Sequence, residues 1–146
     1  MRNEIVISPA QFEHRDAMIS LLRSEKLPTE DLSADVSNFF IAMDQGLVIG
    51  IIGLEVYGDD GLLRSLAVRP EYRNMNIGTV LVSELENQGR NLGISNFYLL
   101  TETAMEYFSK KGYEVVNRKD APASIQGSSE FKYACPSSAT LMQKCL

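Results

Sequence analysis

The sequence predicts an α/β (α+β) fold in which a mixed central sheet carries helices on both faces. Short apolar, β-branched runs alternate with longer stretches in which apolar residues recur at helical spacing. Without internal repeats or low-complexity tracts, these segments follow the order β-α-β-β-β-α-β-α-β-(α)-β. At 146 residues and 45% hydrophobic content, we expect one domain, 1–146, whose core needs neither disulfides nor a metal.

The first elements are a short strand over 5–7 and a helix of about four turns that stops near Pro28. The helix start is predicted from a cap, a proline at the first helical position and a capping-box partner: Ser8, Pro9 and Gln11. Its apolar face is predicted from helical intervals: Phe12, Ile19 and Leu22. We predict no regular structure for the polar stretch 29–37.

Three antiparallel strands are predicted next, over 39–43, 47–57 and 62–68, with turns at 44–46 and 58–61. The middle strand is apolar on both faces, so we expect it to be central and covered twice. Glu55 stands out in it because it is a carboxylate in an otherwise apolar run.

A helix follows the stretch RPEYRNMNIG and is predicted to end at Gly93, with an apolar stripe at Ile77, Val80, Leu81 and Leu85. The later elements are, in order, a strand over 94–100, a short helix capped by Thr103-x-x-Glu106 and ended by Gly112, a strand over 113–116, a helical piece within 120–132 and a strand over 139–145.

Composition excludes several classes of function. A net charge of -5 without Lys/Arg-rich runs argues against nucleic-acid binding, because phosphate backbones are bound by clustered cations. No apolar stretch is long enough to span a bilayer, and the polar start lacks a leader-like apolar region, so we expect a cytoplasmic protein without membrane contact. Cys135 and Cys145 have neither disulfide-framework nor zinc-ligand spacing, and we expect both to be reduced.

The stretch 64–81 leads from a predicted strand through a turn into a helix, which is a geometry that binds anions. The N–H groups of a first helical turn lack intrahelical partners and lie at the positive end of the helix dipole. Gly78 allows close backbone approach, Arg73 offers a cation, and Asn76 tolerates left-handed backbone angles. An ordinary loop that starts a surface helix is the alternative, and spacing alone leaves both open.

Two segments carry a resemblance to a known family: Leu66-Ala67-Val68-x-Pro70-x-Tyr72-Arg73-x-x-Asn76-x-Gly78 and Ala104-Met105-Glu106-Tyr107-Phe108-Ser109-Lys110-Lys111-Gly112-Tyr113. They are similar to the acetyl-CoA motif and a second landmark of the GNAT superfamily of N-acetyltransferases. The resemblance covers nearly the whole chain and implies a mostly antiparallel GNAT sheet. The acetyl-CoA-binding residues it implies are Leu66, Ala67, Val68, Arg73, Asn74, Met75, Asn76, Ile77, Gly78, Thr79 and Phe108.

This sequence departs from the family pattern at two positions. Asn76 stands where the family has the first motif glycine, which keeps a backbone donor but adds a side chain near the phosphates. Phe108 stands where the family often has the tyrosine that protonates the leaving thiolate. Tyr107 is adjacent, but neighbouring helix positions differ by about 100° in direction, so core packing is its expected role.

Glu55 is our candidate general base, since an attacking ammonium must lose a proton to a carboxylate, directly or through water. A solvated carboxylate at the strand end is the equal alternative. Arg64 lies two residues before Leu66 on the same strand face, which would direct its guanidinium toward the acceptor, and together with Tyr57 it is a candidate to bind the acceptor. An internal salt bridge between Arg64 and Glu55 is the competing interpretation.

The resemblance implies direct transfer of an acetyl group from acetyl-CoA to the amine of a small acceptor, with no metal. Arg64 makes an amino-acid-like acceptor the expected one, and homodimer formation is left open. A catalytically impaired acyl-CoA-binding sensor or partner-binding module is the alternative, motivated by Asn76 and Phe108, and a small-ligand or interaction protein that does not bind CoA is a third class. The pieces LLRSLAV and GLEVYGD and the tail from Asp120 also resemble a subgroup labelled arsenic-resistance N-acetyltransferases.

Overall fold

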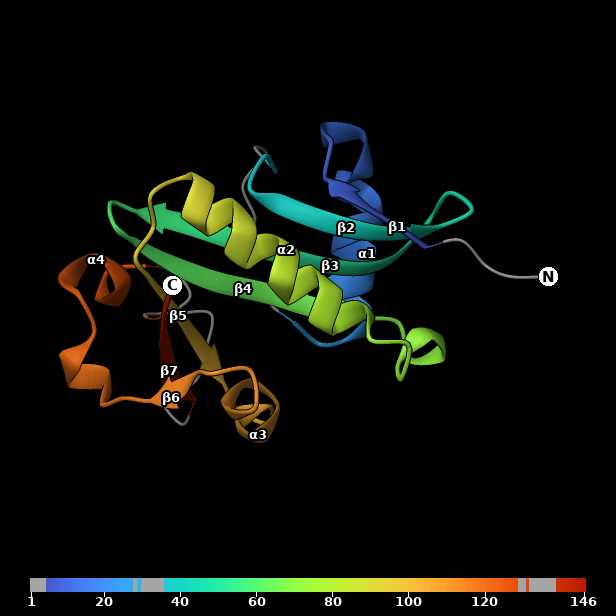
Figure 1. Cartoon of the computed structure of the whole chain (residues 1–146). Coiled ribbons are helices and arrows are strands. Elements are labelled where there is room, and N and C mark those ends of the chain that lie inside the picture. The colour runs from blue at the N-terminus through green and yellow to red at the C-terminus, as the bar shows by residue number, and fades with distance from the viewer. Residues whose placement is uncertain (1–4, 28, 30–35, 129–130, 132–138) are drawn as a thin grey trace. The chain divides into compact units, whose positions relative to one another are not determined.

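The computed structural model describes residues 5–27, 29, 36–128, 131 and 139–146. In these residues the chain forms, in order, β1 (Ile5–Pro9), α1 (Arg15–Ser24), β2 (Phe39–Asp44), β3 (Leu47–Tyr57), β4 (Asp60–Val68), α2 (Ile77–Asn91), β5 (Asn96–Thr101), α3 (Met105–Ser109), β6 (Glu114–Val115), α4 (Ala123–Gln126) and β7 (Thr140–Cys145) (Figure 1). Single 3₁₀ turns cover Phe12–His14, Pro70–Tyr72 and Arg118–Asp120. The predicted order of elements is confirmed.

The strands form a sheet in the order β1-β2-β3-β4-β5-β7-β6. The β1–β2, β2–β3, β5–β7 and β6–β7 pairs are antiparallel, whereas β4 and β5 are parallel over Asp60–Leu62 and Asn96–Tyr98. The predicted mixed, mostly antiparallel sheet is therefore confirmed. No helix in the described residues is long and apolar enough to cross a membrane.

Contacts within the chain divide it into two compact units. The first comprises residues 1–54 and 65–88, and the second comprises residues 55–64 and 89–146. The first unit therefore holds β1, β2, most of β3, the end of β4 and most of α2, and the second holds β5 to β7 with the remaining parts of β3, β4 and α2.

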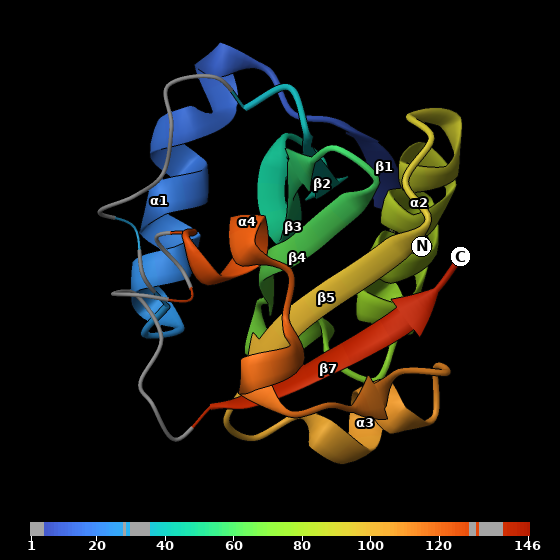
Figure 2. The same ribbon diagram turned by 90° about the vertical axis from the view of Figure 1, so that its left-hand side faces the viewer.

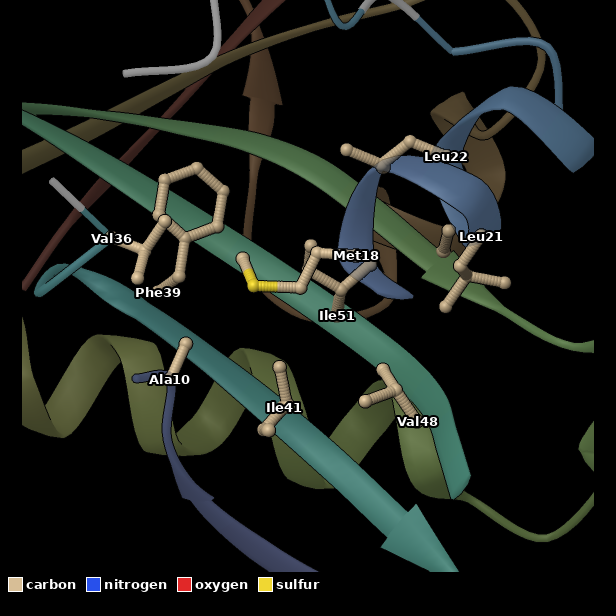
Figure 3. Close-up of a cluster of buried hydrophobic side chains, with 10 residues drawn as sticks. Ala10, Met18, Leu21, Leu22, Val36, Phe39, Ile41, Val48 and Ile51 are labelled. Carbon is tan, nitrogen blue, oxygen red and sulfur yellow. The ribbon is translucent and has the colours of Figure 1, made fainter. Parts of the chain in front are cut away.

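The core of the first unit lies between α1 and the strands. Figure 3 shows Met18 of α1 directed at the strands between Phe39 and Ile51. This cluster consists of Ala10, Met18, Leu21, Leu22, Val36, Phe39, Ile41, Val48, Ile51 and Ala67. Residues 48–54 of β3 are buried without interruption, which confirms the expected coverage of this strand on both faces.

The opposite face of β3 in this unit is covered by α2 (Figure 2). A Cβ added to Gly50 would lie 3.1 Å from Leu81 Cδ1 and 3.3 Å from Ile77 Cγ2. The glycine therefore allows the helix to approach the strand closely, with helices on both faces of these strands as predicted.

The start of the first helix differs from the prediction more than any other boundary. Ser8 and Pro9 belong to β1 and pair with Ile41 and Phe40, because a proline at the end of an edge strand interrupts no further ladder hydrogen bonds. Gln11 caps the 3₁₀ turn Phe12–His14 instead, and its N–H donates to His14 Nδ1 at 3.0 Å. Because the helix begins later than predicted, its buried face differs from the predicted one, and Phe12 is 73% exposed.

Two further details were wrong. Val80 is exposed and Val82 is buried on α2 instead. The hydroxyl oxygen of Thr101, not that of Thr103, accepts the N–H of Ala104 at 2.9 Å before α3. Most of the stretch 29–37, and Cys135, lie outside the described residues.

The second unit has its own apolar cluster, made of Leu62, Tyr98, Ala121, Ile125 and Leu141. Its longest ladder joins β5 to β7, from Asn96 opposite Cys145 to Thr101 opposite Thr140. At the end of α2, a Cβ on Gly89 would lie 2.6 Å from the ring of Phe97, so a glycine is needed there for close packing.

Candidate functional site

The loop from Arg69 to Asn76, between β4 and α2, lies in the first unit and contains the predicted anion site. It begins with the 3₁₀ turn Pro70–Tyr72, and the N–H of Arg73 donates to the Pro70 carbonyl at 3.2 Å. That backbone donor is therefore already used, and phosphate-binding N–H groups must come from later residues.

The second half of the loop has an unusual backbone. Asn74 has φ 73° and Asn76 has φ 60°, both in the left-handed region that asparagine tolerates better than most residues. The carbonyl of Asn76 accepts the N–H of Val80 at 3.1 Å, so Asn76 lies at the start of α2. Asn76 thus adopts the left-handed backbone that it was expected to tolerate, and the N–H groups of the first turn point out of the helix end.

Arg73, the predicted phosphate cation, has a partner within the chain. Its Nη2 forms an ion pair with Glu25 Oε1, and its Nε donates to the Val68 carbonyl at 3.3 Å. The side chain of Arg73 is 54% exposed and that of Glu25 is 18% exposed. An anion that binds Arg73 must therefore share it with Glu25 or displace Glu25 from it.

The other residues of this unit that were predicted to bind the cofactor differ in how far their side chains are buried. Ala67 and Ile77 are buried in the core, so they have only backbone groups to offer a ligand. Met75 is 49% exposed, and Asn74, Asn76 and Thr79 are also exposed. Leu66, Val68 and Gly78 are half-buried.

Glu55, Tyr57 and Arg64 lie together in the second unit. Arg64 Nη1 donates to Glu55 Oε2 at 2.6 Å, and the Tyr57 hydroxyl donates to Glu55 Oε1 at 2.5 Å. The Arg64 side chain is 2% exposed, whereas that of Glu55 is 26% exposed and accessible to water. The internal salt bridge considered for Arg64 is therefore present, and each oxygen of Glu55 is oriented by one donor.

Strict alternation along β4 fails next to Arg64. Ser65 has φ 61°, a left-handed backbone in the middle of a strand. This residue interrupts the regular pleat between Arg64 and Leu66, on which the expectation of a shared face depends. Residues 61–64 are all buried, as in a strand segment that is covered on both faces.

Phe108 of α3 is packed among aromatic rings. It is 5% exposed and makes edge-on contacts with Tyr113 at 5.5 Å and Tyr107 at 5.2 Å between ring centroids. Tyr107 is half-buried, and Lys111 Nζ lies 4.5 Å from its ring centroid. Tyr107 therefore packs against the edge of the core through the buried ring of Phe108.

Residues 35–115, more than half of the chain, match the family model described as acetyltransferase (GNAT) domain. The chain belongs to the GNAT acetyltransferase family. The match spans β2 to β6 and includes the loop, Glu55 and Arg64.

Curated relatives of this GNAT domain are amino-acid acetyltransferases. That of Mannheimia succiniciproducens is 28% identical over 99 residues, which are 66% of this chain and 23% of the relative. That of Pseudomonas syringae pv. syringae is 34% identical over 87 residues, which are 58% of this chain and 20% of the relative. The matched region thus spans less than a quarter of either relative.

Solved structures share the fold at low identity. N-acetylglutamate synthase from Neisseria gonorrhoeae, complexed with coenzyme A and N-acetyl-glutamate, has a TM-score of 0.86 and 19% identity, covering 100% of this chain and 36% of the synthase chain. Rv2747 from Mycobacterium tuberculosis, in complex with CoA and NLQ, has a TM-score of 0.83 and 24% identity, covering 97% of this chain and 99% of the other.

Two residues that contact the loop were not predicted from the sequence. Glu25 and Asp44 contact Arg73 and Tyr72 across sequence separations of 48 and 28 residues. Glu25 follows α1 and Asp44 ends β2, and neither belongs to the motif. A carboxylate at the carboxyl end of a helix was the one available signal for Glu25, since that position is electrostatically unfavourable without a cation nearby.

Proposed function

We propose that this GNAT domain transfers the acetyl group of acetyl-CoA to the amine of a small, amino-acid-like acceptor. The observation that carries the proposal is the family match, joined to a loop whose left-handed Asn76 starts α2 in the way an anion-binding turn requires. The names of the relatives favour an amino acid as acceptor.

The loop would hold the diphosphate of CoA. The N–H groups at the start of α2 and the exposed side chain of Arg73 are the donors of suitable charge in this segment. Val68, at the end of β4, would orient the thioester carbonyl through its backbone. The buried side chains of Ala67 and Ile77 support this segment from the core.

Glu55 would accept the proton of the attacking amine, directly or through water. The amine nitrogen forms a bond to the thioester carbon, the carbon–sulfur bond breaks, and CoA leaves as a thiolate that takes a proton from water. Arg64 and Tyr57 each donate one hydrogen bond to Glu55, so both carboxylate oxygens keep lone pairs that can accept the proton of the attacking amine. Direct transfer requires no covalent enzyme intermediate.

The experiment is a panel assay with acetyl-CoA and free amino acids, decarboxylated amines and an amino-acid-like organoarsenical. Acetylated product should be detected by mass spectrometry, because the exposed thiol of Cys145 would react with reagents that detect free CoA. We expect acceptor-dependent turnover with at least one amino-acid-like amine. Binding of CoA without turnover for any acceptor would refute the proposal.

An acyl-CoA sensor that has lost catalysis is the second candidate. It is favoured by Phe108, which has no hydroxyl to protonate a thiolate and is 5% exposed among aromatic rings. Saturating acetyl-CoA would raise the unfolding temperature of both an enzyme and a sensor, because ligand binding stabilises the native state. Only the enzyme would then release CoA faster when an acceptor is added.

A further inference from the structure

Asp44, the last residue of β2, is a buried carboxylate whose side chain is hydrogen-bonded through one oxygen. It is 8% exposed, and its Oδ2 accepts the hydroxyl of Tyr72 at 2.5 Å. Its Oδ1 is buried without a hydrogen-bond partner in the part of the chain that the structure describes. Burying a carboxylate oxygen in this way is unfavourable, so the Tyr72 contact must offset a real cost.

The backbone on the Asp44 side of this contact is held in place. Asp44 pairs with Ile5 of β1 and with Leu47 of β3, so strands lie on both sides of it. The tight turn that follows uses Gln45 at φ 50° and Gly46 at φ 85°. Asp44 therefore provides a fixed point at the end of a three-stranded ladder.

The Tyr72 side of the contact is a short loop segment. Local hydrogen bonds hold the 3₁₀ turn, with the Tyr72 N–H donating to the Arg69 carbonyl at 2.9 Å. Arg69 also reaches β3, through its N–H to the Ile49 carbonyl at 2.8 Å and its Nε to the Val48 carbonyl at 3.0 Å. Tyr72 adds a second fixed point three residues later, immediately before the part of the loop that contains Asn74 and Asn76.

The hydrogen bond to Asp44, followed by burial, raises the pKa of Tyr72 above its ordinary value of 10.0. The hydroxyl therefore remains a donor throughout the neutral pH range. Neither Asp44 nor Tyr72 has a role in the mechanism proposed above, since the donors assigned to the diphosphate are Arg73 and the start of α2.

We propose that Asp44 and Tyr72 form a positioning pair that fixes the loop before α2 in the shape that receives the diphosphate of acetyl-CoA. This inference rests on the proposed function and adds to it two residues that act without touching the reacting atoms. The pair acts on the half of the cofactor that carries the phosphates. The thioester and the acceptor amine are recognised independently of it.

The test compares two acetyl donors in the full chain carrying Tyr72→Phe. Acetyl-CoA contains the diphosphate, whereas S-acetylpantetheine has the same thioester without it. We expect KM for acetyl-CoA to rise about threefold to tenfold, the size of one lost hydrogen bond. We expect kcat, KM for the amine and kcat/KM for S-acetylpantetheine to stay unchanged.

Two further variants separate positioning from general damage to the fold. Asp44→Asn keeps an oxygen acceptor for the Tyr72 hydroxyl and should recover most of the affinity that Asp44→Ala loses. Adding Tyr72→Phe to Asp44→Ala should cause no additional loss, because the two residues share one interaction. Tyr98→Phe on β5 is a matched control that removes another hydroxyl and should leave KM for acetyl-CoA unchanged.

The outcomes are distinguishable. Equal loss of activity with both acetyl donors would show damage to the fold, and an unchanged KM for acetyl-CoA in Tyr72→Phe would show that the contact does not shape the loop. Either result overturns the inference while leaving the proposed function intact. A wild-type chain that does not bind CoA in calorimetry would overturn the proposed function, and this inference with it.

Discussion

Replacing Arg64 by methionine tests whether this arginine serves Glu55 or the acceptor. In the second unit, Arg64 is 2% exposed and its Nη1 lies 2.6 Å from Glu55 Oε2. Methionine keeps much of the apolar stem and removes the charge, so packing changes less than with alanine. Glu55 then keeps the Tyr57 hydroxyl as a donor but loses its ion pair.

The loss of stability can be estimated from the exposed fractions of the Arg64 and Glu55 side chains. Breaking a fully buried ion pair costs about 3–5 kcal/mol, because the remaining charge stays buried. Glu55 is 26% exposed, so water can solvate part of the orphaned carboxylate. We therefore expect the free energy of unfolding to fall by about 2–3 kcal/mol in denaturant titration. Arg23→Met on α1, where the arginine is exposed, is the matched control and should change it by less than about 0.5 kcal/mol.

The kinetic assay uses an amino acid and the amine formed by its decarboxylation. If Arg64 orients Glu55, kcat should fall by about tenfold to a hundredfold for both acceptors, as part of the benefit of a general base is lost. Glu55→Gln should then remove most of the further effect of Arg64→Met. A loss confined to KM for the carboxylated acceptor would refute this reasoning and assign Arg64 to the substrate.

Three further predictions follow from individual contacts. Glu25→Gln should tighten CoA binding about twofold to fivefold in calorimetry at low salt, because Arg73 loses its competing carboxylate, and the gain should disappear in an Arg73→Gln background. Gly53→Ala should lower the free energy of unfolding by about 1–3 kcal/mol in denaturant titration, because the new Cβ would lie 2.6 Å from Phe39 Cζ, and Phe39→Leu in the same chain should restore part of it. In an ultraviolet titration, Tyr72→Phe should lose one tyrosine ionisation, and the lost ionisation should have a pKa above 10.0. Below pH 10.0 the Tyr72 hydroxyl keeps its proton and donates to Asp44, and this hydrogen bond is lost as pH rises through the elevated pKa.

Local sequence signals predicted the elements well where they agreed with one another. The turn residues at 44–46 and the uninterrupted apolar run of β3 were together sufficient to predict the hairpin and its burial. The start of α1 failed because Ser8 and Pro9 fit a helix start as well as they fit the end of an edge strand. Pairing of β1 with β2, a contact across more than 30 residues, decided between the two, and no local signal reports it.

The same distinction between local signals and long-range contacts separates the parts of the candidate site that were predicted from those that were not. The strand, turn and helix start within 64–81 were predicted because their signals are contiguous, and Asn76, which was expected to tolerate left-handed angles, has φ 60°. The pairing of Arg64 with Glu55 was one of two alternatives, since both lie on strands with a short turn between them. Glu25 and Asp44 were not predicted because their partners lie 48 and 28 residues away.

The two departures from the family pattern differ in their consequences. At Asn76 the backbone adopts φ 60°, so the asparagine supplies the conformation for which a glycine would be used, at a small steric cost. At Phe108 the difference is chemical, because the ring is buried against Tyr113 and carries no proton to donate. Tyr107 lies on a different side of the helix, with its ring against Lys111. The first change keeps the backbone conformation that the proposed diphosphate site requires, whereas the second removes a candidate acid, so that in the proposed mechanism water protonates the leaving thiolate.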